Sequence, residues 1–370
     1  MKIQIYYSIL TLTILISACK KEQIQPENCE FTKVLGQNES RNFKMGFSTW
    51  SFGPDETDKV ETMNFISQNS DVYCEQIDDK IPWDALINNT AYPQEFTDEI
   101  DFRVQQRLGV DLFLAIDLLN TDRSDLLEDY NGNIPEYSYL YDTEIKDAFV
   151  KHIKWLINKF SPDYLIITQE ANELYIKDRD KWNEFKILII DVFTEIKQTY
   201  PDLPVSVSIV LHNLYEPEDV SNVSEYQNEV KAFIETMDFV PISFYPFFKG
   251  MHTKPEFQKA FDFINNFTEK PIAFVETCHL AENLEIKSFD LEIDSDICGQ
   301  NNYLEVLFEN AQINNYWFVI WWAHRDFDEL WETFPAEHKD LGKLWRDTGI
   351  LNEAGENRPA YETWIDVYAH

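Results

Sequence analysis

The chain has 370 residues, with 66 Asp and Glu against 31 Lys and Arg, and a formal net charge of -35. This charge argues against nucleic acid as a partner, because proteins bind phosphate backbones through Lys and Arg. The length suffices for a large core. The 15% of aromatic residues suits such a core, and equally a cleft that stacks rings on sugars.

The N-terminal stretch "MKIQIYYSILTLTILISAC" has the features of an export signal. Lys2 precedes an apolar run that is too short and wrongly flanked for a membrane-spanning helix. The last four residues, "ISAC", resemble the bacterial lipobox, in which the cysteine is lipidated after cleavage before it. The resemblance implies a signal peptide over residues 1–18, acyl chains on Cys19 and a polar tether over residues 19–40. We therefore expect an exported bacterial lipoprotein, anchored at a membrane on a face that stays open: outer membrane, periplasm or cell surface.

Four further cysteines follow, namely Cys29, Cys74, Cys278 and Cys298. Export permits disulfides. Cys278 and Cys298 are the closest pair in the body of the chain and the candidate bridge, although unpaired core thiols are the expected state. No Cys or His spacing typical of a zinc site occurs, and the acidic stretches lack the spacing of a calcium loop. No metal or cofactor is therefore expected.

Eight short apolar runs alternate with longer segments whose apolar residues recur at helical spacing. The runs are, in chain order, "KMGFST" from Lys44, "DVYCEQ" from Asp71, "VDLFLAI" from Val110, "DYLIIT" from Asp163, "PVSVSIV" from Pro204, "FVPISFY" from Phe239, "PIAFVE" from Pro271 and "YWFVIWW" from Tyr316. This alternation is typical of βα units. Eight units predict an α/β fold of the (β/α)8 TIM-barrel type, as a single domain over residues 41–370.

In such barrels the functional residues lie where the strands end. Strands four, six, seven and eight end in "QEANE", "SFYPFF", "FVETCH" and "WWAHRD". This set resembles the retaining (β/α)8 glycoside hydrolases, a clan in which an Asn-Glu pair closes strand four and a second Glu closes strand seven. It is most similar to the endo-β-1,4-galactanases (arabinogalactanases, family 53), on the segments "SFYPFFKG" and "VET". The resemblance covers Gly46 to about Trp364.

By this resemblance Glu173 is the acid/base, Glu276 the nucleophile, Asn172 a donor to the sugar 2-hydroxyl and Tyr245 the phenol that orients the nucleophile. Glu170 is then a supporting carboxylate. Retaining hydrolysis needs a carboxylic acid and a carboxylate about 5 Å apart, and strands four and seven can face each other across the mouth. The acid needs a raised pKa.

A structural alternative is that the strand-four carboxylates only form salt bridges, with Lys177 or Arg179 as partners. Many clan members also place an Arg at the end of strand two, whereas this strand runs "CEQIDDKIPW" without one. Arg123, after strand three, is the candidate replacement.

Aromatic side chains are the candidates for stacking on sugar faces, and they are Trp50, Trp83 and one of Trp321 and Trp322. Alternation lets only one of the last two point inward.

Polar groups could contact hydroxyls in the same cleft. They are Asp78 with Asp79 after strand two and His212, His279 and His324 after later strands. For each histidine a structural role is the simpler interpretation.

The leading hypothesis is a monomeric, lipid-anchored, retaining endo-β-glycanase that acts on a β-galactan-like polysaccharide. A β-1,3-glucanase or another clan member would use the same carboxylates with other cleft loops. Exo action on oligosaccharides, a non-catalytic glycan-binding lipoprotein and a structural protein are the further alternatives. A binder would not need both carboxylates.

Overall fold

A computed structural model describes residue 29 and residues 31–370. The expected signal peptide and Cys19 lie outside these residues. Among the helices of the described part, none combines the length and the apolar composition that crossing a bilayer requires.

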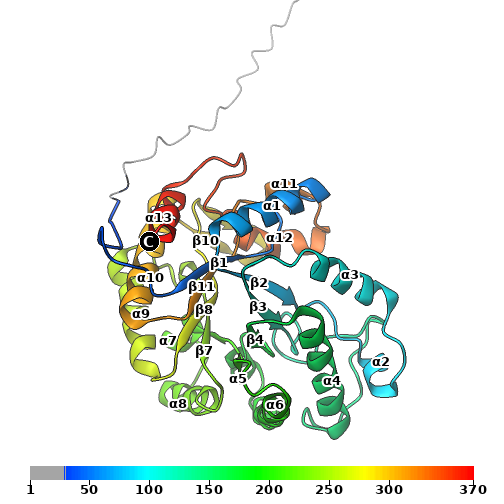
Figure 1. The fold of residues 1–370 in the computed structure, drawn as a ribbon. Helices are drawn as coiled ribbons and strands as arrows, with labels where there is room; N and C mark the ends of the chain where they lie inside the picture. The colour runs from blue at the N-terminus through cyan, green and yellow to red at the C-terminus, as the bar shows by residue number, and fades with distance from the viewer. Residues whose placement is uncertain (1–28, 30) are drawn as a thin grey trace, which may run out of the picture.

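Nine short strands form one parallel sheet in the order β5-β4-β3-β2-β1-β11-β8-β7-β6 (Figure 1). The two ends of this order, β5 (Val205–Ser206) and β6 (Ile209–Val210), are halves of one extended segment. The sheet therefore closes on itself as a barrel. The remaining barrel strands are β1 (Lys44–Ser48), β2 (Val72–Ile77), β3 (Asp111–Ile116), β4 (Tyr164–Ile166), β7 (Val240–Phe244), β8 (Ile272–Thr277) and β11 (Phe318–Trp321).

The eight expected strands are all present, and the predicted (β/α)8 barrel is confirmed. One of them, "PVSVSIV", is interrupted between β5 and β6. At the interruption the backbone of Ser208 bonds to the carbonyl of Thr168 and to the amide of Ala171. The strand-five segment thus stays attached to strand four where strand four ends.

Helices surround the sheet (Figure 1). They are α1 (Glu56–Asn69), α2 (Trp83–Asn88), α3 (Gln94–Gln105), α4 (Thr143–Phe160), α5 (Asn172–Lys177), α6 (Arg179–Thr199), α7 (Leu211–Tyr215), α8 (Val223–Ile234), η1 (Pro246–Lys249), α9 (Lys254–Phe267), η2 (Lys287–Phe289), α10 (Ile297–Asn314), α11 (Asp328–Glu332), α12 (Ala336–Arg346) and α13 (Pro359–Tyr368). A small antiparallel pair, β9 (Leu284–Ile286) and β10 (Leu291–Ile293), follows β8. In α4 the buried positions Ile145, Phe149 and Ile153 recur every four residues, which gives the helix one apolar face for the sheet.

Alternation along the strands separates two apolar layers. One cluster fills the barrel interior and comprises Val72, Cys74, Phe113, Ala115, Ile166, Phe239, Ala273, Val275, Phe318 and Ile320. The neighbouring residues on each strand pack outward against the helices. Continuing the inward positions beyond Cys74 and Ala115 brings Gln76 and Asp117 to the barrel mouth.

The residues expected to form part of a polar tether instead pack on the barrel. Cys29 forms a disulfide with Cys298 at the start of α10. The backbone amide of Thr32 donates to Glu305, and Leu35 is buried. The docked chain thus begins before residue 41.

The disulfide also corrects the cysteine assignment. The candidate Cys278–Cys298 bridge does not form, because Cys298 is taken by Cys29. Cys74 and Cys278 are unpaired, buried thiols, as expected of core cysteines. Burial raises the pKa of both thiols well above the usual value, which leaves them protonated and unreactive.

We predict that Cys29→Ser lowers the melting temperature by several degrees. The bridge joins residues 269 positions apart, and cross-links over long loops contribute about 2–5 kcal/mol. Calorimetry on purified protein checks this. Cys298→Ser and the double variant should lose the same amount, since each removes the same bridge. A wild type whose melting does not change under reducing agent would contradict the assignment.

Candidate active site

A β-bulge turns Glu276 into the barrel mouth. The pairing of β7 with β8 jumps from Phe274 to Glu276, so that Val275 is an extra residue in β8. Bulges of this kind re-aim side chains next to functional sites. The hydroxyl of Tyr245, just after β7, donates to Oε1 of Glu276. Nε2 of Gln76, at the end of β2, donates to Oε2 at 3.0 Å. Both carboxylate oxygens are therefore held.

The environment of Glu276 disfavours its charge. Burial and the nearby charge of Glu170 raise the pKa of Glu276 to about 8. The hydrogen bond from Tyr245 and the positive charge of Arg123 lower this pKa in part. Glu170 and Glu276 thus interact electrostatically across the mouth.

Strand four ends in a conformation that the chain must enforce. Glu170 has φ 53°, in the left-handed region that a non-glycine residue rarely adopts. Its backbone amide donates to Oγ of Ser208 at 2.8 Å. One residue earlier, the amide of Gln169 donates to the buried carboxylate of Asp117 at 3.2 Å. These bonds fix the direction in which the two side chains point.

Arg123 reaches the mouth, as expected of the residue that replaces the missing strand-two Arg. Its guanidinium pairs with Asp117 at 2.5 Å and with Glu170 at 3.1 Å. Arg123 thus pairs with Asp117 and Glu170 and not with Glu276, and the neutral amide of Gln76 lies beside Glu276.

A chain of amides links the two strand ends. Nε2 of Gln76 donates to Oε1 of Gln169 at 3.2 Å as well as to Glu276. The Gln169 side chain is 3% exposed, and its own Nε2 has no partner. A buried donor without a partner costs about 1–3 kcal/mol. A ligand hydroxyl would offset this cost.

Asn172 does not have the expected role. Its Nδ2 donates to the carbonyl of Val210 and the hydroxyl of Tyr226, at 3.1 and 2.7 Å, and the side chain is fully buried. Both amide hydrogens are used within the protein, so none is left for a sugar 2-hydroxyl. Asn172 instead fastens α5 to the strand-five segment.

Glu173 lies on the first turn of α5 and accepts a hydrogen bond from Asn213 at 2.9 Å. Burial raises its pKa. The expected alternative, salt bridges to loop cations, holds in part: Glu170 pairs with Arg123 in the loop after β3, whereas Arg179 pairs with Glu225 and Glu229 on α8. The strand-four charge that acts on Glu276 is that of Glu170.

Aromatic rings stand on two sides of the mouth. Trp50 and Trp322 lie 5.3 Å apart. Elsewhere Tyr245 contacts the rings of Trp345 and His212, at 5.7 and 6.3 Å. The indole nitrogens of all three tryptophans and Nδ1 of His212 are buried without a partner. Burial and a nearby lysine lower the pKa of His212 to about 3, so this imidazole is neutral. Both sides can therefore give N–H groups and ring faces to a ligand.

Two predicted stacking residues belong to the core instead. Trp83 is 1% exposed and donates to the carbonyl of Leu127, and Trp321 is fully buried and donates to that of Thr348. A ring with no exposed face cannot stack on a sugar, so the expectation for Trp83 is wrong, and Trp321 is the member of its pair that stays in the core. Trp322 is the member of its pair that reaches the site, in line with alternation.

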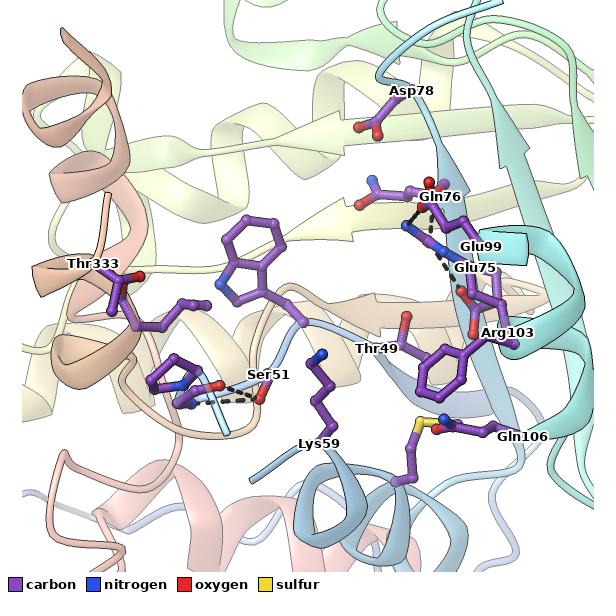
Figure 2. A pocket seen from close by; sticks show the side chains of 16 residues that line it. Thr49, Ser51, Lys59, Glu75, Gln76, Asp78, Glu99, Arg103, Gln106 and Thr333 are labelled. Atoms are coloured by element: carbon purple, nitrogen blue, oxygen red, sulfur yellow. Dashed lines mark hydrogen bonds and ion pairs between the residues drawn. The ribbon is translucent and has the colours of Figure 1, made fainter. Parts of the chain in front are cut away.

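The remaining polar candidates also divide into residues of the core and residues at the site. Both ring nitrogens of His279 bond to backbone carbonyls, and the ring of His324 stacks on Phe65 at 4.6 Å. These two histidines are structural. Asp78 is exposed and lines a cavity beside Gln76 (Figure 2).

Three site residues escaped the sequence motifs: Gln76, Gln169 and Trp345. Glu170 was assigned only a supporting role. The sequence did contain a signal for Gln169 and Glu170. These two residues directly follow the predicted strand "DYLIIT", whereas Asn172 and Glu173 come later and begin a helix. Trp345 had no signal, since its helix is brought to the mouth only by the fold.

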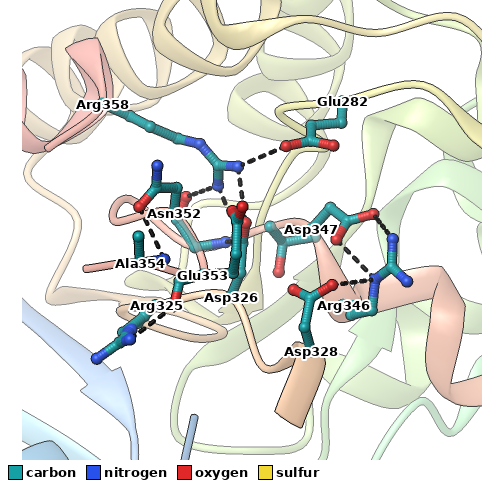
Figure 3. A network of polar contacts seen from close by, with 12 residues as sticks. Glu282, Arg325, Asp326, Asp328, Arg346, Asp347, Asn352, Glu353, Ala354 and Arg358 are labelled. Atoms are coloured by element: carbon teal, nitrogen blue, oxygen red, sulfur yellow. Dashed lines mark hydrogen bonds and ion pairs between the residues drawn. The ribbon is translucent and has the colours of Figure 1, made fainter. Parts of the chain in front are cut away.

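Carboxylates from the segments after β8, β11 and α12 gather in one place, close enough together to share a cation. The described residues contain two such groups, Glu282, Asp326 and Glu353, and Asp326, Asp328 and Asp347. Figure 3 shows the guanidinium groups of Arg358 and Arg346 beside these carboxylates. Arg358 pairs with Asp326 and Glu282, and Arg346 pairs with Asp347 and Asp328. The arginines supply the positive charge that a metal would otherwise bring.

Known proteins confirm the family. The sequence model of glycosyl hydrolase family 53 matches residues 144–341. A search of curated proteins found no match. Among solved structures, the family 53 catalytic domain of Ignisphaera aggregans aligns with a TM-score of 0.58 and 15% identity, over 91% of this chain and 99% of that one.

Two further solved structures show the same fold. A family 5, subfamily 18 glycoside hydrolase of Bifidobacterium longum subsp. longum, in complex with Manβ1-4GlcNAc, has a TM-score of 0.61 and 14% identity over 88% of this chain and 78% of that one. Xylanase 10B from Thermotoga maritima has a TM-score of 0.57 and 13% identity over 89% and 95%. The family match covers more than half of the chain. The protein therefore belongs to glycosyl hydrolase family 53, and it is a retaining, endo-acting O-glycoside hydrolase.

Proposed function

We propose that Glu170 and Glu276 form the catalytic pair, with Glu276 as nucleophile and Glu170 as acid/base. The observation that carries the proposal is the chain from Gln169 through Gln76 to Glu276, because it holds the end of strand four against the nucleophile. Glu173, which the family resemblance suggested as acid/base, is bonded to Asn213 instead.

The reaction is a double displacement. Glu276 attacks the anomeric carbon while the carbon–oxygen bond to the leaving sugar breaks, and Glu170 gives its proton to the leaving oxygen. Water then attacks the glycosyl ester, Glu170 takes the water's proton, and Glu276 leaves.

Three neighbouring residues have the remaining roles in the reaction. Tyr245 orients Glu276 through its hydroxyl. Gln169 offers its unpartnered amide to the hydroxyl next to the anomeric carbon. Arg123 compensates the charge that develops on Glu170 when the proton leaves.

The substrate is a β-linked polysaccharide, and we propose a β-galactan-like chain on the strength of the family match. Incubation with β-galactan, β-glucans, β-mannan and xylan tests this. Release from β-galactan is expected. If sugar is released only from another glycan, that glycan is the substrate and the assignment of the catalytic pair still stands, because the cleft loops decide which sugar fits.

We further propose that the protein acts as a monomer and that it is a membrane-anchored lipoprotein; the "ISAC" segment supports the anchor. Acyl chains on Cys19 would leave a short link to the disulfide at Cys29. Labelling of cells that express the gene with radioactive palmitate should mark the wild type and not Cys19→Ala. Equal labelling of both, or of neither, would contradict the anchor.

We predict that Glu170→Gln loses about 10²–10⁴-fold activity on the polysaccharide and far less on aryl glycosides whose leaving group needs no proton. Azide should restore turnover on the aryl substrate, because a small nucleophile needs no general base. Kinetics on both substrates check this. Glu276→Ala should be inactive on both.

Glu173→Gln is the matched control, because it makes the same change three residues further along the chain. It should keep most of the activity. If Glu173→Gln instead shows the leaving-group dependence and the azide rescue while Glu170→Gln does not, Glu173 is the acid/base.

We predict that Tyr245→Phe shifts the acidic limb of the pH profile of kcat/KM to higher pH. The hydroxyl of Tyr245 lowers the pKa of Glu276 by bonding to its charged form, so its removal raises that pKa. Because the nucleophile acts as the carboxylate, more alkaline conditions are then needed. An unchanged limb would exclude Glu276 as the group that titrates there.

A further inference from the structure

Residues 31–43 form a strap that runs along α10 from one end of the barrel to the other (Figure 1). The helix begins after the loop that follows β8, at the catalytic end, and it ends just before β11, at the opposite end. Its 18 residues span about 27 Å. The strap follows the helix in the same direction, so the chain passes the depth of the barrel before it enters β1.

The strap is fixed to α10 at both ends. At the catalytic end, Cys29 forms its disulfide with Cys298 in the first turn of the helix. At the opposite end, the backbone amide of Asn42 donates to the side chain of Gln312 at 3.1 Å. The amide of Gln312 donates in turn to Glu39 at 3.1 Å. The direction of the strap along the helix is therefore set.

A buried carboxylate lies under the middle of the strap. Glu305 is fully buried, and its partners are the backbone amide of Thr32, the side-chain amide of Asn301 and the ammonium group of Lys254. A buried charge is stable only while such partners are in place. Further along the strap, Leu35 belongs to the apolar core. The strap is thus an integral part of the barrel.

The strap decides where the preceding chain leaves the barrel. The start of β1 lies at the end opposite the mouth, whereas Cys29 lies at the end where Glu276 is found. Cys29 is ten residues beyond Cys19, and ten residues reach at most about 35 Å. Lys44 is 25 residues beyond Cys19, and a free chain of that length could reach about 85 Å. The strap therefore shortens the link and moves it to the catalytic end.

The charges near the attachment point do not draw the barrel to a membrane. The β9–β10 hairpin, just before Cys298 in the sequence, exposes Glu285, Asp290 and Glu292. Lys287 lies 3.6 Å from Glu285, which compensates its charge. Anionic lipids attract basic segments and not acidic ones. Any orientation of the barrel at a membrane thus comes from the short link.

We propose that the strap orients the catalytic end of the barrel toward the membrane. The inference rests on the lipid anchor at Cys19 that is part of the proposed function. It adds the surface that the anchored enzyme faces: the loops around the mouth face the lipid headgroups, and the opposite end of the barrel points away. A glycan chain then enters the mouth from the side, between the barrel and the bilayer.

The test is energy transfer from a dye on the lipidated full chain to an acceptor lipid in phosphatidylcholine vesicles. Dyes are attached through Ser288→Cys, after β8, and Glu269→Cys, before β8, at two exposed positions. The native thiols of Cys74 and Cys278 are buried and take no dye. Because the two ends lie about 27 Å apart along α10, transfer at position 288 should be at least about twice that at position 269.

A second pair of dyes reports on the far side of the barrel. Thr121→Cys lies after β3 and Gly109→Cys before it, both at exposed positions, and β3 is opposite β8 in the closed sheet. A Cβ at Gly109 meets no atom within 4 Å. More transfer at position 121 than at position 109 is expected if the whole catalytic end faces the membrane. Equal transfer within either pair, or more at the opposite end, overturns the orientation.

Two controls separate the causes. Cys19→Ala should show no transfer at any position, and a wild type that behaves in the same way overturns the anchor itself. An insertion of about 20 Gly and Ser residues after Lys21 makes the link long and flexible, so transfer should become similar at both ends. A difference that persists in this variant would show that the barrel binds lipid directly, and it would overturn the role of the short link.

Discussion

One guanidinium organises the barrel mouth. Arg123 pairs with Asp117 and Glu170 and lowers the pKa of Glu276 through its charge. Three carboxyl groups in a poorly solvated mouth would otherwise repel one another, and burying an unpaired charge is costly. Because Asp117 also accepts the backbone amide of Gln169, the same ion pair fixes how strand four ends. Charge balance and side-chain direction thus depend on one interaction.

A second ion pair positions Trp345 against Tyr245. Arg358 makes a bidentate pair with Asp326, at 2.8 and 2.7 Å, and Asp326 also accepts the backbone amide of Gly349 at 2.8 Å (Figure 3). These bonds tie the loop after β11 to the end of the chain. The loop carries α12 and with it Trp345, whose ring contacts Tyr245. Tyr245 and Trp345 are 100 residues apart in the sequence, and their rings meet at the barrel mouth because the bonds of Asp326 fix the start of this loop.

The barrel could be predicted because its signal is local. Each strand is a short apolar run, and a buried parallel strand needs nothing more than such a run. Glu276 was found for the same reason, since "FVET" ends a clear strand. The alternation that admits only one of Trp321 and Trp322 also followed from the strand itself.

The features that could not be predicted depend on contacts that the local sequence pattern does not show. Glu170 and Glu173 are three residues apart, and only the left-handed backbone at Glu170 and its bond to Ser208 decide which side chain faces the nucleophile. Trp83 was predicted as a cleft residue and is in the core because its helix, α2, packs against α4. The Cys29 bridge spans most of the chain, and no spacing rule reaches so far.

The central claim is that Glu276 forms the covalent bond to the sugar while the end of strand four supplies the proton. A 2-deoxy-2-fluoro glycoside of the sugar that the enzyme releases, with a good leaving group, would trap the glycosyl ester, because the fluorine slows its hydrolysis. Peptide mapping by mass spectrometry then locates the label. The account predicts the label on Glu276, in wild type and in Glu170→Gln alike. A label on Glu170 or Glu173, or turnover of the glycoside with no covalent adduct, would contradict it.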